Sequence, residues 1–136
     1  MYSPILTAPM REDVTRLGIK ELRKPEDVDE ALKARKGSVM VFVNSVCGCS
    51  AGSARPALRI ALQNKKLPDK MYTVFAGVDS DATNKARSYF TGYEPSSPSI
   101  AIMRDGKMVK MIERKDIQGR SSEEIAEELV EVFDGL

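Results

Sequence analysis

The sequence contains no histidine. Without histidine the chain cannot form a Ser-His or Cys-His catalytic pair, and a mononuclear metal site would depend on thiolates and carboxylates alone. Long apolar runs are also missing, because no window approaches the roughly 20 apolar residues that a membrane-spanning helix needs. We therefore expect neither histidine-dependent catalysis nor a membrane-embedded protein.

An excess of positive or negative charge is also lacking, since the formal net charge is only +1. This balance gives no reason to expect nucleic acid or an acidic membrane surface as a partner. The first residues lack the basic segment and apolar stretch of a secretion signal, so we expect a cytoplasmic protein. With 136 residues, 42% hydrophobic and 30% charged, the chain has the size and composition expected of one domain over residues 1–136.

Only two cysteines occur, and a single glycine separates them, as Cys47-Gly48-Cys49. The apolar run 39–43 before them is rich in β-branched and aromatic residues, which predicts a strand covered on both faces. The small and apolar residues of segment 49–64 predict a helix. A strand would thus deliver two thiols to the start of a helix, where free N–H groups and the helix dipole favour a thiolate.

Structural disulfides are rare in the cytoplasm, so a lone close pair of cysteines indicates catalysis, redox sensing or metal binding. For thiol–disulfide exchange, Cys47 is our candidate nucleophile and Cys49 the candidate resolving thiol. A disulfide closed through one residue forms a small, strained ring, and Gly48 is the residue that best tolerates it. Zinc would need carboxylates or a second chain to complete the site, and an inert packing role also stays open.

Several other residues are candidates for supporting the thiols. Asn44 and Ser45 could hydrogen-bond a thiolate or merely cap the turn. Arg55 could add positive potential near the sulfurs, but we expect it in solvent on the helix surface, where most charged side chains lie. A cis bond between Ser97 and Pro98 could place backbone beside the thiols, yet only about 5–6% of X-Pro bonds in folded proteins are cis, so the residues alone favour trans.

Periodicity and turn-forming residues predict a layered α/β chain. The turn Asp105-Gly106 indicates an antiparallel hairpin, Ser121-Ser122-Glu123-Glu124 contains a capping box, and Pro56 should bend the helix that contains it. The expected helices span 10–17, 25–37, 49–64, the segment from Asp79-Ser80 toward Gly92, and the segment after Ser121; the expected strands span 19–22, 39–43, 72–78, 99–104 and 107–112.

Three segments together closely resemble the bacilliredoxins: residues 44–56 (NSVCGCSAGSARP), 74–79 (VFAGVD) and 89–99 (YFTGYEPSSPS). The similarity runs from about Met10 to the last helix. It implies a thioredoxin-like three-layer fold, with a central mixed sheet of about four to five strands flanked by helices, an extra N-terminal helix, and Cys-Gly-Cys in place of Cys-x-x-Cys. It also implies that the Ser97–Pro98 bond is cis and that Pro98 faces the cysteines, although most X-Pro bonds are trans.

The resemblance further implies an activity, namely attack on a mixed disulfide between a protein cysteine and bacillithiol, a small thiol. Cys47 would be the attacking and S-thiolated residue, and Cys49 would resolve the intermediate. The implied partners are S-thiolated proteins and the small thiol as co-substrate, with no further cofactor, weak disulfide reductase or isomerase activity, and a monomer or weak dimer. The alternative is a redox-sensing or metal-binding module that uses the same cysteine pair.

Overall fold

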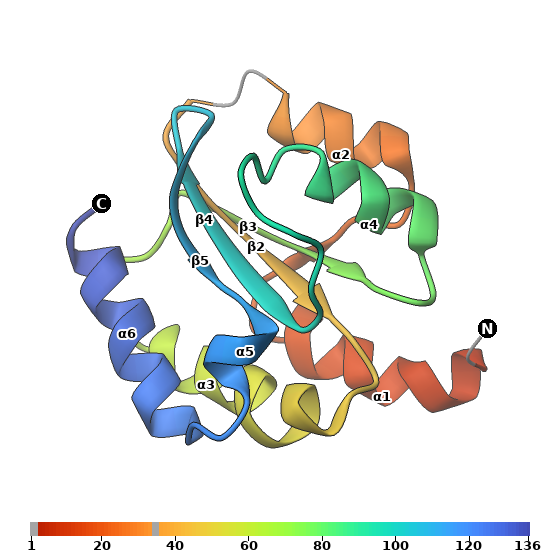
Figure 1. The fold of residues 1–136 in the computed structure, drawn as a ribbon, viewed down its shortest axis with the longest axis horizontal. Coiled ribbons are helices and arrows are strands. Elements are labelled where there is room, and N and C mark those ends of the chain that lie inside the picture. The colour runs from red at the N-terminus through yellow and green to blue at the C-terminus, as the bar shows by residue number, and fades with distance from the viewer. Residues whose placement is uncertain (1–2, 34–35) are drawn as a thin grey trace.

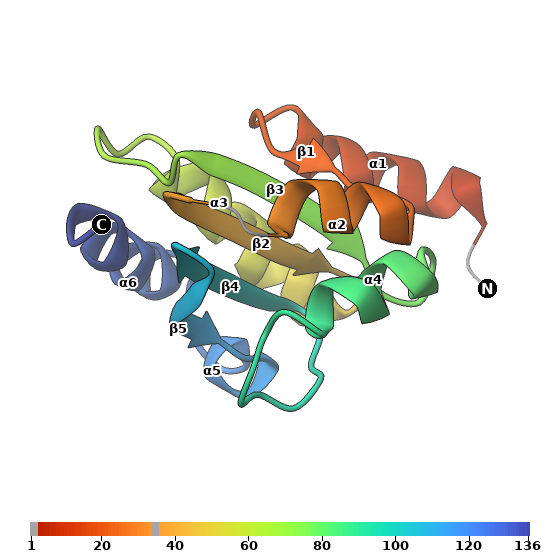
Figure 2. The same cartoon turned by 90° about the horizontal axis from the view of Figure 1, so that it is seen from above.

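A five-stranded sheet lies between two groups of helices (Figure 1; Figure 2). The computed structural model describes residues 3–33 and 36–136. The strands are β1 (Lys20–Glu21), β2 (Ser38–Asn44), β3 (Lys70–Phe75), β4 (Ser99–Arg104) and β5 (Lys107–Ile112). The helices are α1 (Pro4–Thr15), α2 (Pro25–Leu32), the π-helical η1 (Ser50–Ala54), α3 (Arg55–Ala61), α4 (Ser80–Arg87), α5 (Arg114–Ile117) and α6 (Ser122–Asp134).

The sheet is mixed, with the strand order β1-β3-β2-β4-β5. β1 and β2 both run parallel to β3, whereas β4 is antiparallel to β2 and to β5. β2 occupies the middle of the sheet, and each of its residues is buried. The continuous apolar run 39–43 is explained by this position, because helices cover both faces of the central strand. The expected mixed sheet of four to five strands is confirmed.

Alternate residues of β2 point into two separate cores. Met40 and Phe42 pack against α1, α3, α5 and α6, and Val41 packs against α2 and α4 on the other face. The two helical layers are visible on opposite sides of the sheet in Figure 2. Because successive side chains of a strand point to opposite faces, β2 contributes to both cores, and this packing fixes the position of its end.

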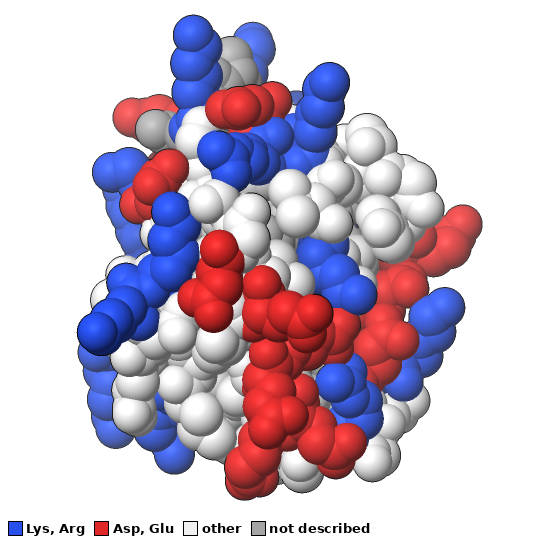
Figure 3. Space-filling view, turned by 90° about the vertical axis from the view of Figure 1, so that its left-hand side faces the viewer, with Lys and Arg blue, Asp and Glu red and all other residues white. Residues whose placement is uncertain are grey.

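α6 shows how the surface charge is arranged. Its apolar face, including Leu129 and Phe133, is buried, and its acidic residues face outward, where Figure 3 shows them gathered in the lower half of this view. Glu128 pairs with Lys110 and Arg120 at 2.9 and 2.7 Å, so acidic and basic side chains interleave at the border. Within residues 3–33 and 36–136, no helix combines the length and apolarity needed to cross a bilayer.

Several element boundaries differ from the predictions. α1 begins at Pro4 rather than at Met10, because the Ser3 hydroxyl accepts a hydrogen bond from the backbone N–H of Ile5 and proline fits the first helical turn. The extra N-terminal helix is thereby confirmed. α2 ends at Leu32 rather than at Gly37, and residues 34–35 lie outside the described part of the chain.

Two further differences lie close to the cysteines. β3 ends at Phe75, and the chain then turns through Gly77, whose φ of 80° suits glycine. α5 was not predicted, because it has only four residues; its one sequence signal is the capping box formed by Glu113 and Asp116. Asp79 precedes α4 as predicted, but its side chain does not cap the helix.

Candidate active site

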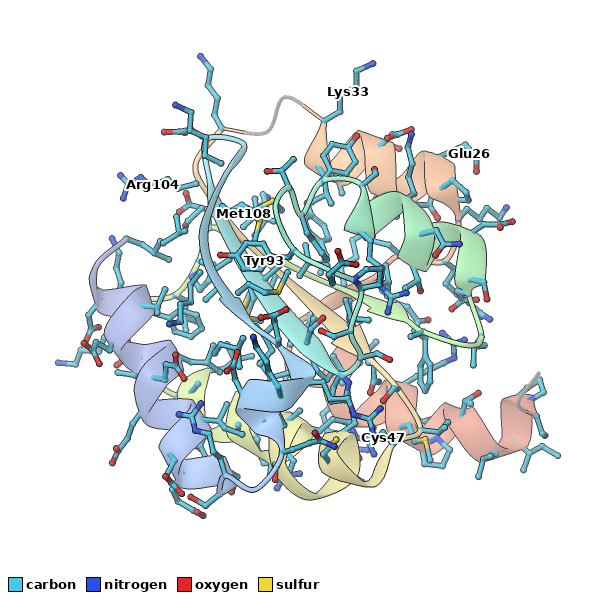
Figure 4. All side chains as sticks on the ribbon, in the orientation of Figure 1. Glu26, Lys33, Cys47, Tyr93, Arg104 and Met108 are labelled. Atoms are coloured by element: carbon cyan, nitrogen blue, oxygen red, sulfur yellow. The ribbon has the colours of Figure 1, made fainter. Side chains whose placement is uncertain are left out.

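Cys47 lies between the end of the central strand and the start of the following helix (Figure 4). β2 ends at Asn44, a short turn carries Cys47, and Cys49 directly precedes η1. Because β2 lies between β3 and β4, the segments that continue β3 and precede β4 meet beside this turn. The structure therefore brings both thiols to the place expected from the sequence.

The helix after the cysteines is not one continuous α-helix. In η1, the N–H of Arg55 bonds to the carbonyl of Ser50, which is one residue further back than in an α-helix. Pro56 lies in the first turn of α3, where its missing N–H costs no helical hydrogen bond. The predicted helix with Pro56 inside it is therefore confirmed, since helical residues run without a break from Cys49 to Ala61, but the part before the proline is π-helical.

The sulfurs of Cys47 and Cys49 are 3.0 Å apart, both residues are partly buried, and no disulfide joins them. Hydrogen bonds from the thiol and the backbone N–H of Cys49 lower the pKa of Cys47. Burial raises the pKa of Cys49, and its contact with Cys47 raises it further. Cys47 is thus favoured as the thiolate while Cys49 keeps its proton, which makes Cys47 the better nucleophile of the two.

Gly48 has no special backbone conformation in this dithiol form. Its φ lies outside the left-handed region, and a Cβ at this position would meet no atom within 4 Å. Nothing in the dithiol form therefore requires glycine. The need for glycine in a closed Cys47–Cys49 ring stays a prediction about the oxidised form.

Arg55 is buried, with 5% of its surface exposed, so the expected place in solvent is wrong. Its Nη1 donates to the side chains of Asn44 and Ser50 and to the carbonyl of Ser45, at 2.9 to 3.1 Å. Its Nε lies 3.8 Å from a carboxylate oxygen of Asp13 in α1. Burial lowers the pKa of Arg55. The guanidinium therefore joins the strand end, the turn and the helix start beneath the cysteines.

Asn44 and Ser45 organise the turn rather than bind a sulfur. The Asn44 Oδ1 accepts hydrogen bonds from the backbone N–H of Ser45 and from Ser50 and Arg55, and its Nδ2 donates to the carbonyl of Met10 in α1. The Ser45 hydroxyl accepts the backbone N–H of Cys47 at 3.2 Å. Of the two roles left open by the sequence, the structure shows the turn-capping one.

The Ser97–Pro98 bond is cis. The family resemblance implied this, whereas the low frequency of cis X-Pro bonds in folded proteins favoured trans. Strand register explains why this segment reaches the site. Val43 pairs with Ser99 across the antiparallel β2 and β4, so the residues that precede Ser99 run beside those that follow Val43. Pro98 and Ser97 are thereby placed next to the turn that carries the cysteines.

An open pocket of ≈ 370 Å³ lies beside Cys47. Residues from four parts of the chain line it: Ser45, Val46, Cys47, Ala76, Gly77, Ser97 and Arg114. Arg114 belongs to α5, and its Nη1 donates to the carbonyl of Ser97 at 3.4 Å. Its charge lowers the pKa of Cys47, and also acts to lower that of Cys49 against the stronger effect of burial. Sequence reasoning missed this residue, because only the packing of α5 brings it to the thiols.

A metal site has little support in the part of the chain that the structure describes. Those residues contain no group of three or more Cys, Asp or Glu side chains placed to hold a metal ion. The cysteine pair would therefore need ligands from outside this set.

A dithiol at the end of a central strand, beside a cis-proline and an open pocket, is the arrangement of thiol–disulfide exchange. The fold agrees with this chemistry. A solved structure described as having a thioredoxin fold superposes with a TM-score of 0.62, covers 84% of this chain and 92% of its own, and is 16% identical. The protein therefore has a thioredoxin fold.

Sequence relatives define the family. A family model described as disulphide isomerase matches residues 2–136. A bacilliredoxin from Koribacter versatilis is 50% identical over 98% of this chain and 92% of its own length. A bacilliredoxin from Cytophaga hutchinsonii is 49% identical over the whole of both chains, and one from Geobacillus kaustophilus is 48% identical over 98% of this chain and 92% of its own. The chain belongs to the bacilliredoxin family and is a thiol–disulfide oxidoreductase.

Proposed function

We propose that this oxidoreductase removes bacillithiol, or a similar small thiol, from S-thiolated proteins in the cytoplasm. The observation that carries the proposal is the pocket of ≈ 370 Å³ beside the partly exposed Cys47. A pocket of this size can hold a small thiol, and its open side leaves room for a protein to present the mixed disulfide. The name of the relatives, bacilliredoxin, supports bacillithiol as that small thiol.

In the first step, the Cys47 thiolate attacks the small-thiol sulfur of the mixed disulfide. The bond between the two substrate sulfurs breaks, and a new disulfide forms between Cys47 and the small thiol. The substrate protein's sulfur leaves as a thiolate and takes a proton from solvent. The disulfide is only moved, with no net oxidation or reduction, so the step needs no further cofactor.

Cys49 is placed for the second step, since its sulfur lies 3.0 Å from that of Cys47. The negative charge of Cys47 contributes to the raised pKa of Cys49, and this contribution disappears once Cys47 carries the small thiol. Cys49 then ionises more easily, attacks the Cys47 sulfur, forms the Cys47–Cys49 disulfide and releases the small thiol. Two molecules of small thiol, which leave joined as their own disulfide, or one dithiol reductase, which leaves as its disulfide, return the pair to the dithiol form. The same exchange with ordinary disulfides would give weak reductase or isomerase activity.

The test is mass spectrometry of the reaction with one S-bacillithiolated protein, using wild type, Cys47→Ser and Cys49→Ser. We expect wild type to free the substrate, Cys47→Ser to lose this activity, and Cys49→Ser to accumulate with bacillithiol attached to Cys47. The S-glutathionylated form of the same substrate is the control for the choice of small thiol. Retained activity without Cys47, or an equal loss in both variants with no adduct, would contradict the assigned roles.

The alternative function, a redox-sensing or metal-binding module, predicts different observations on the same preparations. Zinc bound stoichiometrically, or a change of oligomeric state on oxidation without turnover of the S-thiolated substrate, would favour it. We expect a monomer or weak dimer whose size does not change with oxidation, which size-exclusion chromatography of both redox forms would check.

A further inference from the structure

Among the residues that the structure describes, Arg114 is the one with a permanently charged side chain in the lining of the pocket beside Cys47. The other lining residues are small, apolar or uncharged, apart from the reactive thiol itself. A ligand group that enters this pocket therefore meets small uncharged residues, two of them serines, and one guanidinium. Such a lining favours a group that is anionic and accepts hydrogen bonds.

The charge of Arg114 is not neutralised within the part of the chain that the structure describes. Its guanidinium donates to the carbonyl of Ser97, and its backbone N–H donates to the hydroxyl of Ser96, both at 3.4 Å. Nearby cations differ in this respect, because Lys115 pairs with Glu113 at 3.5 Å and Arg120 pairs with Glu128 at 2.7 Å. A guanidinium has five N–H donors, so Arg114 keeps donors for a ligand.

Arg114 and Cys47 line the same pocket, and the positive charge of Arg114 acts on both sulfurs. A small thiol bonded to Cys47 therefore has its non-sulfur part next to the guanidinium. Arginine binds a carboxylate through two parallel hydrogen bonds, which gives orientation as well as attraction.

We infer that the pocket is a carboxylate-binding subsite in which Arg114 holds the acidic part of the small thiol while its sulfur exchanges at Cys47. This inference rests on the proposed exchange at Cys47 and adds the chemical class of the small thiol, namely one that carries a carboxylate. Arg114 thus selects among small thiols in addition to favouring the thiolate.

Three small disulfides separate these two effects of Arg114: dithiodipropionate, which is anionic, hydroxyethyl disulfide, which is neutral, and cystamine, which is cationic. The rate of the first exchange at Cys47 is measured with each, at low salt, for wild type, Arg114→Met and Arg114→Lys. Lys115→Met is the matched control, because Lys115 is exposed, adjacent in α5 and outside the pocket lining. Each variant is compared with wild type on the same disulfide, so differences in leaving group cancel.

Relative to the neutral disulfide, we expect Arg114→Met to slow the anionic one about threefold to fivefold, the range of a single partly exposed ion pair. Cystamine should not be slowed more than the neutral disulfide, Arg114→Lys should keep most of the selectivity, and Lys115→Met should leave it unchanged. High salt should reduce the wild-type preference, because screening weakens exposed charge pairs.

Equal slowing of all three disulfides by Arg114→Met would overturn the inference and leave Arg114 only a role in lowering the pKa of Cys47. Equal selectivity loss in Lys115→Met would also overturn it, because the effect would then come from the general surface charge. A carboxylate on the substrate protein could also contact Arg114. The fourth substrate is therefore a peptide whose cysteine forms a mixed disulfide with neutral mercaptoethanol and lies next to an acidic residue. If only this peptide responds to Arg114→Met, the carboxylate belongs to the protein and the inference about the small thiol is wrong.

Failure of the proposed function gives a different result from failure of this inference. If wild type did not exchange with the neutral disulfide, or exchanged equally well without Cys47, the proposed chemistry would be wrong whatever the charge preference.

Discussion

The active-site pocket has two walls that are built in opposite ways. The near wall is formed by Ser45, Val46 and Cys47, and the rest of segment 44–55 supports it from beneath, including the buried Arg55 with three hydrogen bonds of 2.9 to 3.1 Å from Nη1. The far wall is formed by Ser97 and Arg114, and the Arg114 side chain is exposed and makes one hydrogen bond of 3.4 Å. The near wall is therefore held rigidly around the Cys47 sulfur, whereas the far wall is open to a ligand.

This difference teaches that one type of side chain serves two purposes in one site. A buried guanidinium whose donors are used by the protein fixes the backbone that carries the thiols. An exposed guanidinium with donors to spare is available to a substrate. Changes in the near wall should therefore alter stability and thiol chemistry together, whereas changes in the far wall should mainly alter substrate choice, with a smaller effect on the pKa of Cys47.

The largest expected contrast between the walls is in stability. Arg55→Met should lower the free energy of unfolding by about 2–3 kcal/mol, because it removes charge-assisted hydrogen bonds and leaves the buried carbonyl of Ser45 without that partner. Arg114→Met should cost less than about 0.5 kcal/mol, as is usual for an exposed residue. Denaturant unfolding of the reduced proteins measures both. Arg59→Met, an exposed arginine in the same helix as Arg55, is the control. Equal losses at Arg55 and Arg114 would show that the walls do not differ in this way.

The second contrast is in the ionisation of Cys47. Cys49→Ala should raise the pKa of Cys47 more than Arg114→Met does, because the hydrogen bond from the Cys49 thiol contributes more than the charge of Arg114. The reactivity of wild-type Cys47 toward a neutral disulfide should level off at a lower pH than that of an unperturbed thiol, and the Cys49→Ala curve should move to higher pH. Thiolate absorbance against pH measures the shift directly. A larger shift in Arg114→Met would mean that the far wall controls the sulfur.

The lowered pKa of Cys47 also predicts the sign of its effect on stability. A thiolate favoured in the folded state contributes stability that is fully present above the unfolded pKa of about 8.5 and is lost as pH falls through the folded pKa. Cys47→Ser should remove this part of the pH dependence of unfolding. If the two unfolding profiles remain parallel across that range, the folded-state shift is absent.

A further contrast concerns two glycines near the thiols, Gly48 between the cysteines and Gly77 in the pocket lining. Gly48→Ala should change the stability of the dithiol form by less than about 0.5 kcal/mol, since its Cβ meets no atom within 4 Å. Gly77→Ala should cost about 1 kcal/mol, because alanine is strained at a φ of 80°. If the closed ring needs glycine, Gly48→Ala should also shift the thiol–disulfide equilibrium toward the dithiol, which redox titration against a thiol buffer would detect. An unchanged equilibrium would remove the reason proposed for this glycine.

Local sequence was sufficient for much of the fold. The apolar run of β2, the Asp105-Gly106 hairpin and the capping box at Ser121 each predicted an element that the structure contains, because each depends on interactions within a few residues. The start of α1 and the π-helical turn before Pro56 were not predicted, because several backbone arrangements suit the same residues and packing selects among them.

The chain by itself determined the chemistry: two thiols one residue apart after a buried strand, no histidine, and segments that identify the family. Tertiary structure decided everything that depends on contacts between distant segments. Arg55, which was expected at the surface, is buried beneath the near wall, and the packing of α5 brings Arg114 to the pocket. The physical reason is that the environment of a side chain depends on the segments that pack against it, and the residues next to it in the sequence do not determine which segments those are.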